Sequence, residues 1–518
     1  MYYNSAKVQI DIGNMLSSVS GEVPSGMLEK VFNRHLPDLS RYSGAGGVRI
    51  FDADSGRCLT GLVPALQDTL AGLGIPTEVR DERPLLQRSF DWRLSPDIAL
   101  RDYQQDVVET ALAHDRGIVA AGTGSGKTLI GAAIIARLGV PAIWVTTSRV
   151  LLEQTVRDLR AALGLEPGVC GDGRWEEGDV TVALVQALEA RPDAFRPGQF
   201  PLLIFDEGHH AAARTFCAAC LRLDPRRSFY LTAVPYRETE DQVVLDALTG
   251  GVIASVPSVD LIEKGWLCPL DIRFLPLDIA GTMTEQPFAA LYRQFIVENH
   301  ARNRRVATLA EHHARAGESV LVLVTHLDHG RRLLELMNEK SAFAHGQLGR
   351  RALQQTVADF RARDTRILVA TTGLFAEGVN IRGTSCIVYA AGLRSRTRVL
   401  QAVGRGMRLA PGKDVCIYCD FIDRDPLGRF LAHSRRRLQV LAEAGFAVPE
   451  DPTLSDPVRD ENVPDATWVP RPGGNGFLKV AADGDILEIL NCAAQPERVP
   501  KHFCRLCPDT RCPQKEER

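Results

Sequence analysis

The chain contains 518 residues with a mass of 56.8 kDa, of which 45% are hydrophobic and 24% are charged. This length exceeds what one ordinary core needs and predicts roughly three to four domains. The net charge of −3 gives no sign of a nucleic-acid partner. Such a partner would have to be recognised by local basic patches, because contacts with phosphates are local. With no long apolar run and no basic flank before an apolar stretch at the start, we expect a cytoplasmic protein without a transmembrane helix or secretion signal.

Residues 1–90 are predicted to form a small α+β domain of their own. Apolar spacing predicts short strands at 48–51 and 58–62 and short helices at 25–32 and 63–73, separated by glycine-rich turns. No chemical motif is present there, and its position before the motifs suggests a DNA-recognition domain. Residues 80–97 contain two prolines and many charges, which is typical of a linker.

From about residue 98 the pattern changes to short apolar runs that alternate with longer helical segments. The first set of predicted strands comprises residues 117–121, 142–146, 180–184, 202–205 and 229–231. The second comprises residues 320–324, 342–344, 367–370, 386–390 and 415–417. Continuous apolar strands between helices indicate parallel sheets covered on both faces. We therefore predict two tandem α/β lobes at 91–255 and 256–445, with a junction in the proline-rich 255–287, and a C-terminal extension at 446–518.

The first motif is AGTGSGKT at residues 121–128, between a predicted strand and a predicted helix. Glycines in such a loop let backbone N–H groups turn toward phosphate oxygens, and the following helix adds its positive N-terminal end. Lys127 is expected to reach the terminal phosphates of a nucleotide, and Thr128 to bind Mg²⁺. The predicted phosphate-binding residues are Gly122, Thr123, Gly124, Ser125, Gly126, Lys127 and Thr128.

The second motif is Asp206-Glu207-Gly-His209 at the carboxyl end of the apolar strand 202–205. Ligands of parallel α/β sheets bind at this end of the strands. Asp206 is expected to hold Mg²⁺, and Glu207 to orient the attacking water or accept its proton. We expect a coupling role for His209.

The third motif is QAVGRGMR at residues 401–408 in the second lobe. Arg405 and Arg408 are three residues apart, a spacing that places them on one face of a helix. Guanidinium groups suit the spread negative charge of a phosphoryl group in transfer. If the two lobes face each other, these arginines complete the ATP site from across the cleft, and hydrolysis then depends on lobe closure.

Further segments complete a resemblance to the superfamily 2 DEAD/DEAH-box helicases over about residues 97–437. Arg101-Asp-Tyr103-Gln104 resembles the adenine-recognising motif, and Thr146-Thr-Ser-Arg149 resembles motif Ia. The remaining segments resemble motif Ib at 181–186, motif III at 231–235, motif V at 371–380 and motif VI at 401–408. The family has two RecA-like lobes, so the resemblance implies an ATP-dependent motor that acts on nucleic acid.

The resemblance also implies roles for individual residues. Arg101, Tyr103 and Gln104 would recognise adenine, and Gly378 would help to bind the nucleotide. Thr232 would link the ATP state to the grip on DNA. The residues that would lie along the DNA strand or couple it to hydrolysis are Thr146, Arg149, Thr371, Thr372 and Gln401.

Within the family, the segments 100–104 and 261–269 resemble the DNA-repair and phage branch-migration helicases. Two departures are visible: motif II reads Asp-Glu-Gly-His, and motif III has Val234 where many members have Thr. Val234 affects the expected efficiency with which ATP hydrolysis is coupled to movement, and it does not affect the expected ATPase activity itself. The absence of the Asp-Glu-Ala-Asp box tilts the expected substrate toward DNA, in repair or recombination.

Cysteine and arginine clusters leave alternatives open. Cys504, Cys507 and Cys512 are candidate zinc ligands, but structural zinc needs four ligands, so plain thiols remain an alternative. The C-x₂-C pairs at 217/220 and 416/419 lie in apolar segments and are expected to be core thiols. The basic run at 433–437 could contact phosphates or form a solvated helix face.

The sequence therefore predicts a DNA helicase or branch-migration translocase that uses ATP and Mg²⁺. One alternative is a duplex-DNA translocase or restriction-type motor subunit that does not separate strands, and another is an RNA helicase. A non-catalytic binder on an inactive motor fold is a third, against which the complete set Lys127, Asp206, Glu207, Arg405 and Arg408 argues.

Overall fold

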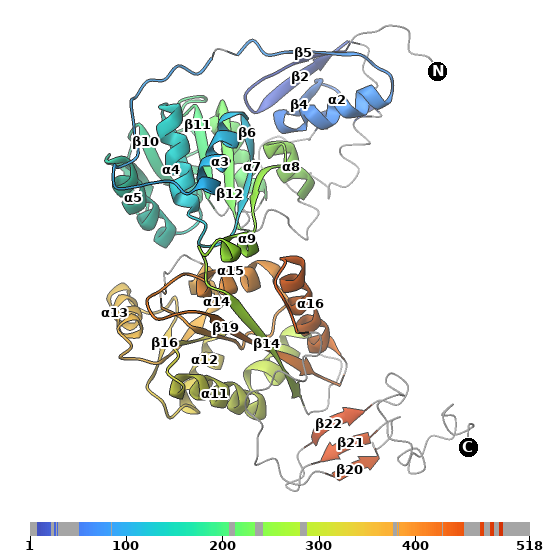
Figure 1. Cartoon of the computed structure of the whole chain (residues 1–518). Helices are drawn as coiled ribbons and strands as arrows, with labels where there is room; N and C mark the ends of the chain where they lie inside the picture. The colour runs from blue at the N-terminus through green and yellow to red at the C-terminus, as the bar shows by residue number, and fades with distance from the viewer. Residues whose placement is uncertain are drawn as a thin grey trace, which may run out of the picture. The chain divides into compact units, whose positions relative to one another are not determined.

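The computed structural model describes residues 8–21, 25–26, 28, 51–83, 85–206, 213–233, 242–279, 287–376, 381, 383–426, 428–449, 467–470, 477–480 and 486–490. These residues divide into two compact units, Met1–Leu261 and Ile262–Arg518. Each unit contains a parallel sheet with helices (Figure 1), as the tandem α/β prediction requires. None of the described helices has the length and apolar character that crossing a bilayer requires.

The N-terminal domain contains a five-stranded sheet, ordered β3-β4-β2-β1-β5, together with helix α2. Its elements are β1 (Val8–Asp11), β2 (Leu16–Ser20), β3 (Phe51–Asp52), β4 (Arg57–Leu59), η2 (Thr60–Leu62), α2 (Val63–Gly72) and β5 (Thr77–Arg80). Strands β1 and β2 alternate buried and accessible residues, which is the pattern of a sheet with one covered face. The predicted helix at 63–73 is confirmed, whereas β1, β2 and β5 were not predicted.

Lobe 1 contains an eight-stranded sheet, ordered β13-β6-β12-β11-β7-β10-β8-β9, in which only the β8–β9 pairing is antiparallel. Its strands are β6 (Arg116–Ala121), β7 (Ala142–Thr146), β8 (Gly168–Gly171), β9 (Arg174–Glu176), β10 (Val180–Leu184), β11 (Leu202–Asp206), β12 (Arg227–Thr232) and β13 (Val252–Val256). Its helices are α3 (Asp102–Leu112), α4 (Lys127–Leu138), α5 (Arg149–Leu163), α6 (Val185–Ala190), α7 (Ala213–Leu223), α8 (Gln242–Thr249) and α9 (Ser258–Glu263). All five strands predicted for this lobe are present.

Helix α4 packs closely on the sheet because it carries glycine where most helices carry a side chain. A Cβ on Gly131 would lie 2.4 Å from the ring of Trp144, which is fully buried on β7. Glycine in a helix interior costs roughly 1 kcal/mol relative to alanine. Here the close approach of helix and indole accounts for the glycine.

The N-terminal domain and lobe 1 share one hydrophobic core. The same cluster of buried side chains includes Ile10 and Leu66 from the domain and Phe205 and Leu248 from the lobe. The contact is close, since a Cβ on Gly61 would lie 2.5 Å from the carbonyl oxygen of Ala247. The N-terminal domain is therefore packed as part of the first unit.

Charged groups also tie the linker to lobe 1. Arg83 donates to Asp81 and, at 2.8 Å, to Asp115, and Arg226 pairs with the same Asp115. Burial opposes the charge on Asp115, but the guanidiniums of Arg226, Arg83 and Arg227 hold the pKa of this carboxyl below its usual range. The linker thus follows lobe 1 rather than running free of it.

Lobe 2 contains a six-stranded, all-parallel sheet ordered β14-β19-β18-β15-β17-β16. Its strands are β14 (Leu270–Asp278), β15 (Val320–Val324), β16 (Ser341–Ala344), β17 (Ile367–Thr371), β18 (Cys386–Tyr389) and β19 (Cys416–Arg424). Its helical elements are α10 (Phe288–Tyr292), η4 (Arg293–Val297), α11 (His300–Arg315), α12 (Leu327–Glu335), α13 (Arg350–Arg361), α14 (Thr372–Ala376), α15 (Arg396–Gly406) and α16 (Arg429–Glu443).

Strand β14 corrects one expectation, because the proline-rich segment 255–287 was predicted to be an irregular junction. Instead α9 and β14 lie within it, β13 ends at its start, and the first unit ends at Leu261. Pro276 lies within β14, which is an edge strand of its sheet. Proline is tolerated at an edge because its missing N–H faces away from the neighbouring strand.

A buried network of ion pairs fixes α16 and α11 to β19. Arg437 donates to both oxygens of Asp420 at 2.8 Å, and Asp420 also accepts a hydrogen bond from Tyr418. Arg302 binds both oxygens of Asp423 at 2.9 and 3.1 Å. Burial opposes the charge on Arg437, but Asp420 and Asp423 raise the pKa of the guanidinium above its usual range.

This network also resolves the basic run at 433–437. Arg437 is completely buried, Arg436 pairs with Glu443, and Arg435 is exposed. The run is therefore neither a uniform solvated face nor a uniform phosphate-binding surface. Beyond lobe 2, strands β20 (Thr467–Pro470), β21 (Phe477–Val480) and β22 (Ile486–Leu490) form an antiparallel sheet, and Cys504, Cys507 and Cys512 lie outside the described residues.

Replacing Arg437 with Met should leave the buried carboxylate of Asp420 without its counter-charge. Removing one partner of a buried pair costs about 3–5 kcal/mol. We expect that loss in the free energy of unfolding of lobe 2, measured by urea unfolding with hydrogen exchange of β19 and α16 peptides. Arg436→Met, one residue away at the surface, is the matched control and should change protection of these peptides far less. Equal effects of the two substitutions would contradict the assignment.

Candidate functional site

The loop between β6 and α4 has the geometry of a phosphate-binding loop. Strand β6 ends at Ala121 and α4 begins at Lys127. Gly124 and Gly126 have φ angles of +91° and +81°, in the left-handed region that favours glycine. The first N–H groups of an α-helix have no partner within the helix, so the start of α4 attracts anions.

Lys127, the first residue of α4, lies beside this loop. Its Nζ donates to the carbonyl oxygen of Ala121 at 3.3 Å, across the loop that it follows. Thr128 is the second residue of the helix, so its side chain lies on the same first turn as that of Lys127. The ammonium and the hydroxyl predicted to bind the phosphates and Mg²⁺ are thus held at one helix start.

Two side chains from α3 clamp the loop from behind. Tyr103 donates its hydroxyl to the carbonyl oxygen of Ser125 at 2.7 Å, and Gln104 Nε2 donates to the same oxygen at 2.9 Å. Gln104 Oε1 accepts from the backbone N–H of Arg101 at 3.0 Å, and Arg101 Nη1 donates to the hydroxyl of Tyr103 at 3.2 Å. A Cβ on Gly126 would lie 2.5 Å from Gln104 Nε2, so the clamp leaves room for glycine alone.

Sequence reasoning predicted Gln104 as an adenine contact and did not predict this clamp. Both ends of its amide already bind the chain, and the side chain is only 3% exposed. The geometry therefore gives Gln104 a second task, which is to hold the phosphate loop. The adenine contacts of Arg101, Tyr103 and Gln104 remain predictions.

The neighbouring strands end at the same edge of the sheet. Strand β12 pairs with β6, with Thr232 opposite Ala120, and β11 pairs with β12, with Asp206 opposite Leu231. Asp206 and Thr232 are both buried. Parallel pairing thus brings the predicted Mg²⁺ ligand and the predicted coupling residue to the edge where the phosphate loop begins. Glu207 and His209 lie outside the described residues.

This donor set fits ATP with Mg²⁺. The left-handed glycines free the loop backbone for phosphate oxygens, and Lys127 supplies a positive charge at the same helix start. Hydroxyl and carboxylate oxygens, here from Thr128 and Asp206, are the ligands that Mg²⁺ prefers. When bound, the ion would neutralise charge on the phosphates.

In lobe 2 the predicted residues occupy strand and helix ends. Thr371 is the last residue of β17 and Thr372 the first of α14. Arg405 lies in the last turn of α15. The helix ends at Gly406, so Arg408 is not on the helical face that the spacing predicted; its carbonyl oxygen accepts from Lys413 Nζ at 3.1 Å. Gly378 lies outside the described residues.

Burial separates the residues predicted to lie along a DNA strand. Thr146, Thr371, Thr372 and Gln401 are all buried, and Thr146 is 0% exposed. Their burial places these side chains inside the lobes, and the contact of these segments with a DNA strand stays a prediction. Arg149 is exposed at the start of α5, where it pairs with Asp172 at 3.1 Å.

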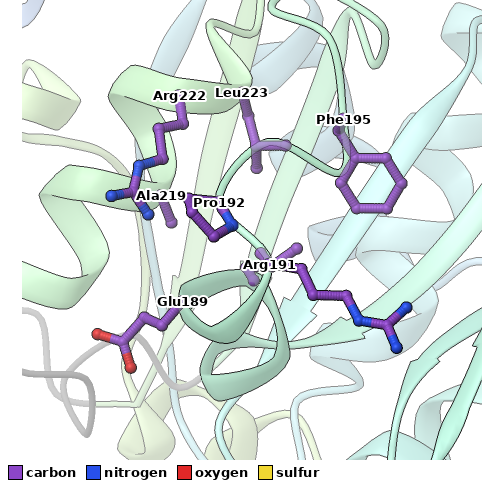
Figure 2. A pocket seen from close by; sticks show the side chains of 8 residues that line it. Glu189, Arg191, Pro192, Phe195, Ala219, Arg222 and Leu223 are labelled. Carbon is purple, nitrogen blue, oxygen red and sulfur yellow. The ribbon is translucent and has the colours of Figure 1, made fainter.

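A shallow hollow on lobe 1 lies away from the predicted residues, between α6 and α7. Figure 2 shows Arg191 and Arg222 reaching to opposite sides of Pro192. The guanidinium of Arg191 already lies 4.6 Å from the ring of Trp175. The hollow contains none of the residues of the phosphate loop or its neighbouring strand ends.

Comparison with known protein families gives two matches. Residues 97–237 match the family "Type III restriction enzyme, res subunit", and residues 302–410 match the "Helicase conserved C-terminal domain". The first match contains the phosphate loop and Asp206, and the second contains Thr371 and Arg405. One match thus lies within each of the two parallel-sheet lobes.

Individual relatives have low identity over long stretches. The DNA 3′-5′ helicase XPB of Mycobacterium tuberculosis is 27% identical over 368 residues, covering 67% of this chain and 64% of the relative. The ATP-dependent DNA helicase uvsW of Enterobacteria phage T4 is 24% identical over 380 residues, covering 67% and 75%. A Rad25 relative in Halobacterium salinarum is 26% identical and is matched over 65% of its length. The chain thus spans just under two thirds of two of these relatives.

Among solved structures, the ATP-dependent Type ISP restriction-modification enzyme LlaBIII bound to DNA has a TM-score of 0.50 at 18% identity. The similarity covers 67% of this chain and 30% of that enzyme, and it supports the fold alone. The chain thus contains the two helicase domains that these family models describe, and its relatives are superfamily 2 helicases of the Rad25/XPB and phage uvsW type.

Proposed function

We propose that this protein hydrolyses ATP to move along DNA and to separate or branch-migrate its strands. The observation that carries the proposal is the edge of the lobe 1 sheet, where Lys127 begins α4 and Asp206 ends β11. Relatives named as DNA helicases support DNA as the partner. Repair or recombination of DNA is the process that the family branch favours.

The residues of the site have proposed roles in hydrolysis. Lys127 binds the terminal phosphates and stabilises the charge that develops on them, while Thr128 and Asp206 hold Mg²⁺. Glu207 orients the attacking water and receives its proton. Arg405 and Arg408 bind the phosphoryl group during transfer.

Coupling and location are also proposed. Thr232 and His209 link the nucleotide state to the grip on DNA, and the exposed Arg149 contacts the strand. The eight described cysteines are all free and buried, which supports a reducing compartment such as the cytoplasm. Zinc at Cys504, Cys507 and Cys512 stays a proposal that rests on their spacing.

Lys127→Ala should abolish most ATP hydrolysis without unfolding lobe 1. Removing one preorganised stabiliser of developing charge costs about 10²–10³-fold in kcat. Steady-state phosphate release in the presence of DNA measures the effect. Arg137→Ala is the matched control, because Arg137 lies exposed on the same helix and pairs with Glu109. Full activity in Lys127→Ala would show that the loop is not the ATP site.

Gln104→Ala should lower hydrolysis of ATP and GTP by similar factors, because the clamp acts on the loop and not on the base. The loss of one buried hydrogen-bonded contact costs about 1–2 kcal/mol, or about 5–30-fold in kcat/KM. The control is Gln105→Ala, at an exposed neighbouring position. Selective loss of ATP hydrolysis would instead favour adenine recognition as the main role.

The substrate is tested by ATPase rates with single-stranded, duplex, forked and four-way DNA and with RNA. We expect DNA to raise the rate and forked or four-way DNA to raise it most, with displacement of a labelled strand. Triplex displacement from plain duplex without strand separation would favour a duplex translocase, which the restriction-enzyme match makes the second candidate. Stimulation by RNA alone would overturn the choice of DNA, and no stimulation by any nucleic acid would overturn the motor.

A further inference from the structure

Lobe 2 contains a cluster of three metal-ligating side chains that takes no part in the proposed ATPase. His313 on α11, Cys386 on β18 and Cys419 on β19 place their ligand atoms within 4.8 Å of one another. The distance from Cys419 Sγ to His313 Nε2 is 3.7 Å. Among the residues described, this is the one group of three or more potential ligands so arranged.

The fold brings these three residues together from distant parts of the sequence. Strands β18 and β19 pair in parallel, with Cys386 opposite Ile417 and Val388 opposite Cys419. Cys386 and Cys419 are therefore diagonal neighbours on one face of the sheet, because side chains alternate along a strand. Helix α11 packs against β15, β17 and β18 and presents His313 to the two sulfurs.

The cluster is enclosed by the core of lobe 2. Cys386 and Cys419 are 0% exposed and His313 is 3% exposed. The sulfurs belong to the same buried group as Leu309, Val322 and Val388, which supply no polar atoms from their side chains. Three ligands with this chemistry, all removed from water, need either one another or an ion to satisfy them.

Diagonal placement also bears on what the two sulfurs can do. Diagonal residues on paired strands lie roughly 7–8 Å apart at Cα, beyond the usual Cα spacing of a disulfide. The two sulfurs are therefore placed to share one ligand with His313 rather than to form a crosslink.

We propose that His313, Cys386 and Cys419 bind one thiophilic metal ion, Zn²⁺ or Cu⁺, as a structural centre of lobe 2. Two sulfurs and one imidazole nitrogen are ligands for these soft or borderline ions and not for Mg²⁺ or Ca²⁺. Structural zinc takes four ligands, one more than these residues supply, whereas Cu⁺ is favoured by soft donors. Cu⁺ is therefore the expected occupant, and Zn²⁺ is the alternative that the metal analysis distinguishes.

The centre would tie α11 to the middle of the sheet. The three side chains that bind the metal come from one helix and two strands. An ion that binds only the folded state adds to the stability of that state. Because both sulfurs are fully buried, we expect the ion to be acquired while the chain folds. This role is independent of the ATP site in lobe 1.

The test measures metal content of the full, untagged chain by mass spectrometry after expression with Zn²⁺ or Cu⁺ supplied. A variant without the tail ligands, Cys504→Ala/Cys507→Ala/Cys512→Ala, removes the other candidate site. We expect this variant to retain about one ion per chain through exhaustive dialysis, and the metal found distinguishes zinc from copper. A folded tail variant that contains no bound metal after both supplements would overturn the proposal.

Substitution in the core then assigns the ion to its ligands. Cys419→Ala in the tail variant should reduce the metal content at least tenfold and remove the thiolate-to-metal absorption of the Co²⁺-substituted protein. Cys416→Ala is the matched control: it is equally buried on the same strand, but its sulfur lies beside Gly406 of α15. Should Cys419→Ala fail to fold, Cys386→Ala gives the same readout. Unchanged metal content in a folded Cys419→Ala or Cys386→Ala variant would contradict the assignment.

Discussion

Strands β6, β12 and β11 pair in parallel, and their register aligns the carboxyl ends of the three strands at one edge of the lobe 1 sheet. The phosphate loop, Thr232 and Asp206 meet at one edge because their strands run in the same direction and in a fixed register. A shift of one residue in β11 would turn Asp206 toward the other face of the sheet. The clamp from Tyr103 and Gln104 then holds the loop at this edge from outside the sheet.

The two lobes solve the problem of burying polar groups differently. Among the described residues of lobe 1, the buried charged side chains are Arg116 and Asp206, which lie at the ends of their strands. Lobe 2 encloses complete ion pairs, Arg437 with Asp420 and Arg302 with Asp423, directly beneath the helices that follow its strands. Such pairs stabilise only when both partners are present, so they define one arrangement of α11, β19 and α16 rather than many.

Sequence patterns predicted the lobe strands well because continuous apolar runs are distinctive. The prediction 142–146 and the prediction 320–324 coincide with β7 and β15. Strand β14 was missed because Pro276 argues against a central strand, and its edge position is a property of the sheet and not of the local sequence. The phosphate-loop residues were predicted from the spacing of glycine, lysine and threonine in the sequence. The contact of Gln104 with the loop and the proximity of His313 to Cys386 depend on tertiary packing, which local sequence spacing does not reveal.

The shared core of the N-terminal domain and lobe 1 has a consequence for how this chain can be divided. Side chains such as Leu245 and Leu248 on α8 are buried in a cluster that includes residues from β1 and α2. A fragment cut to the two motor lobes would expose this apolar surface to water, where it would favour aggregation. The first eighty or so residues are thus part of the unit that must fold for the lobe to stay in solution, whatever else they recognise.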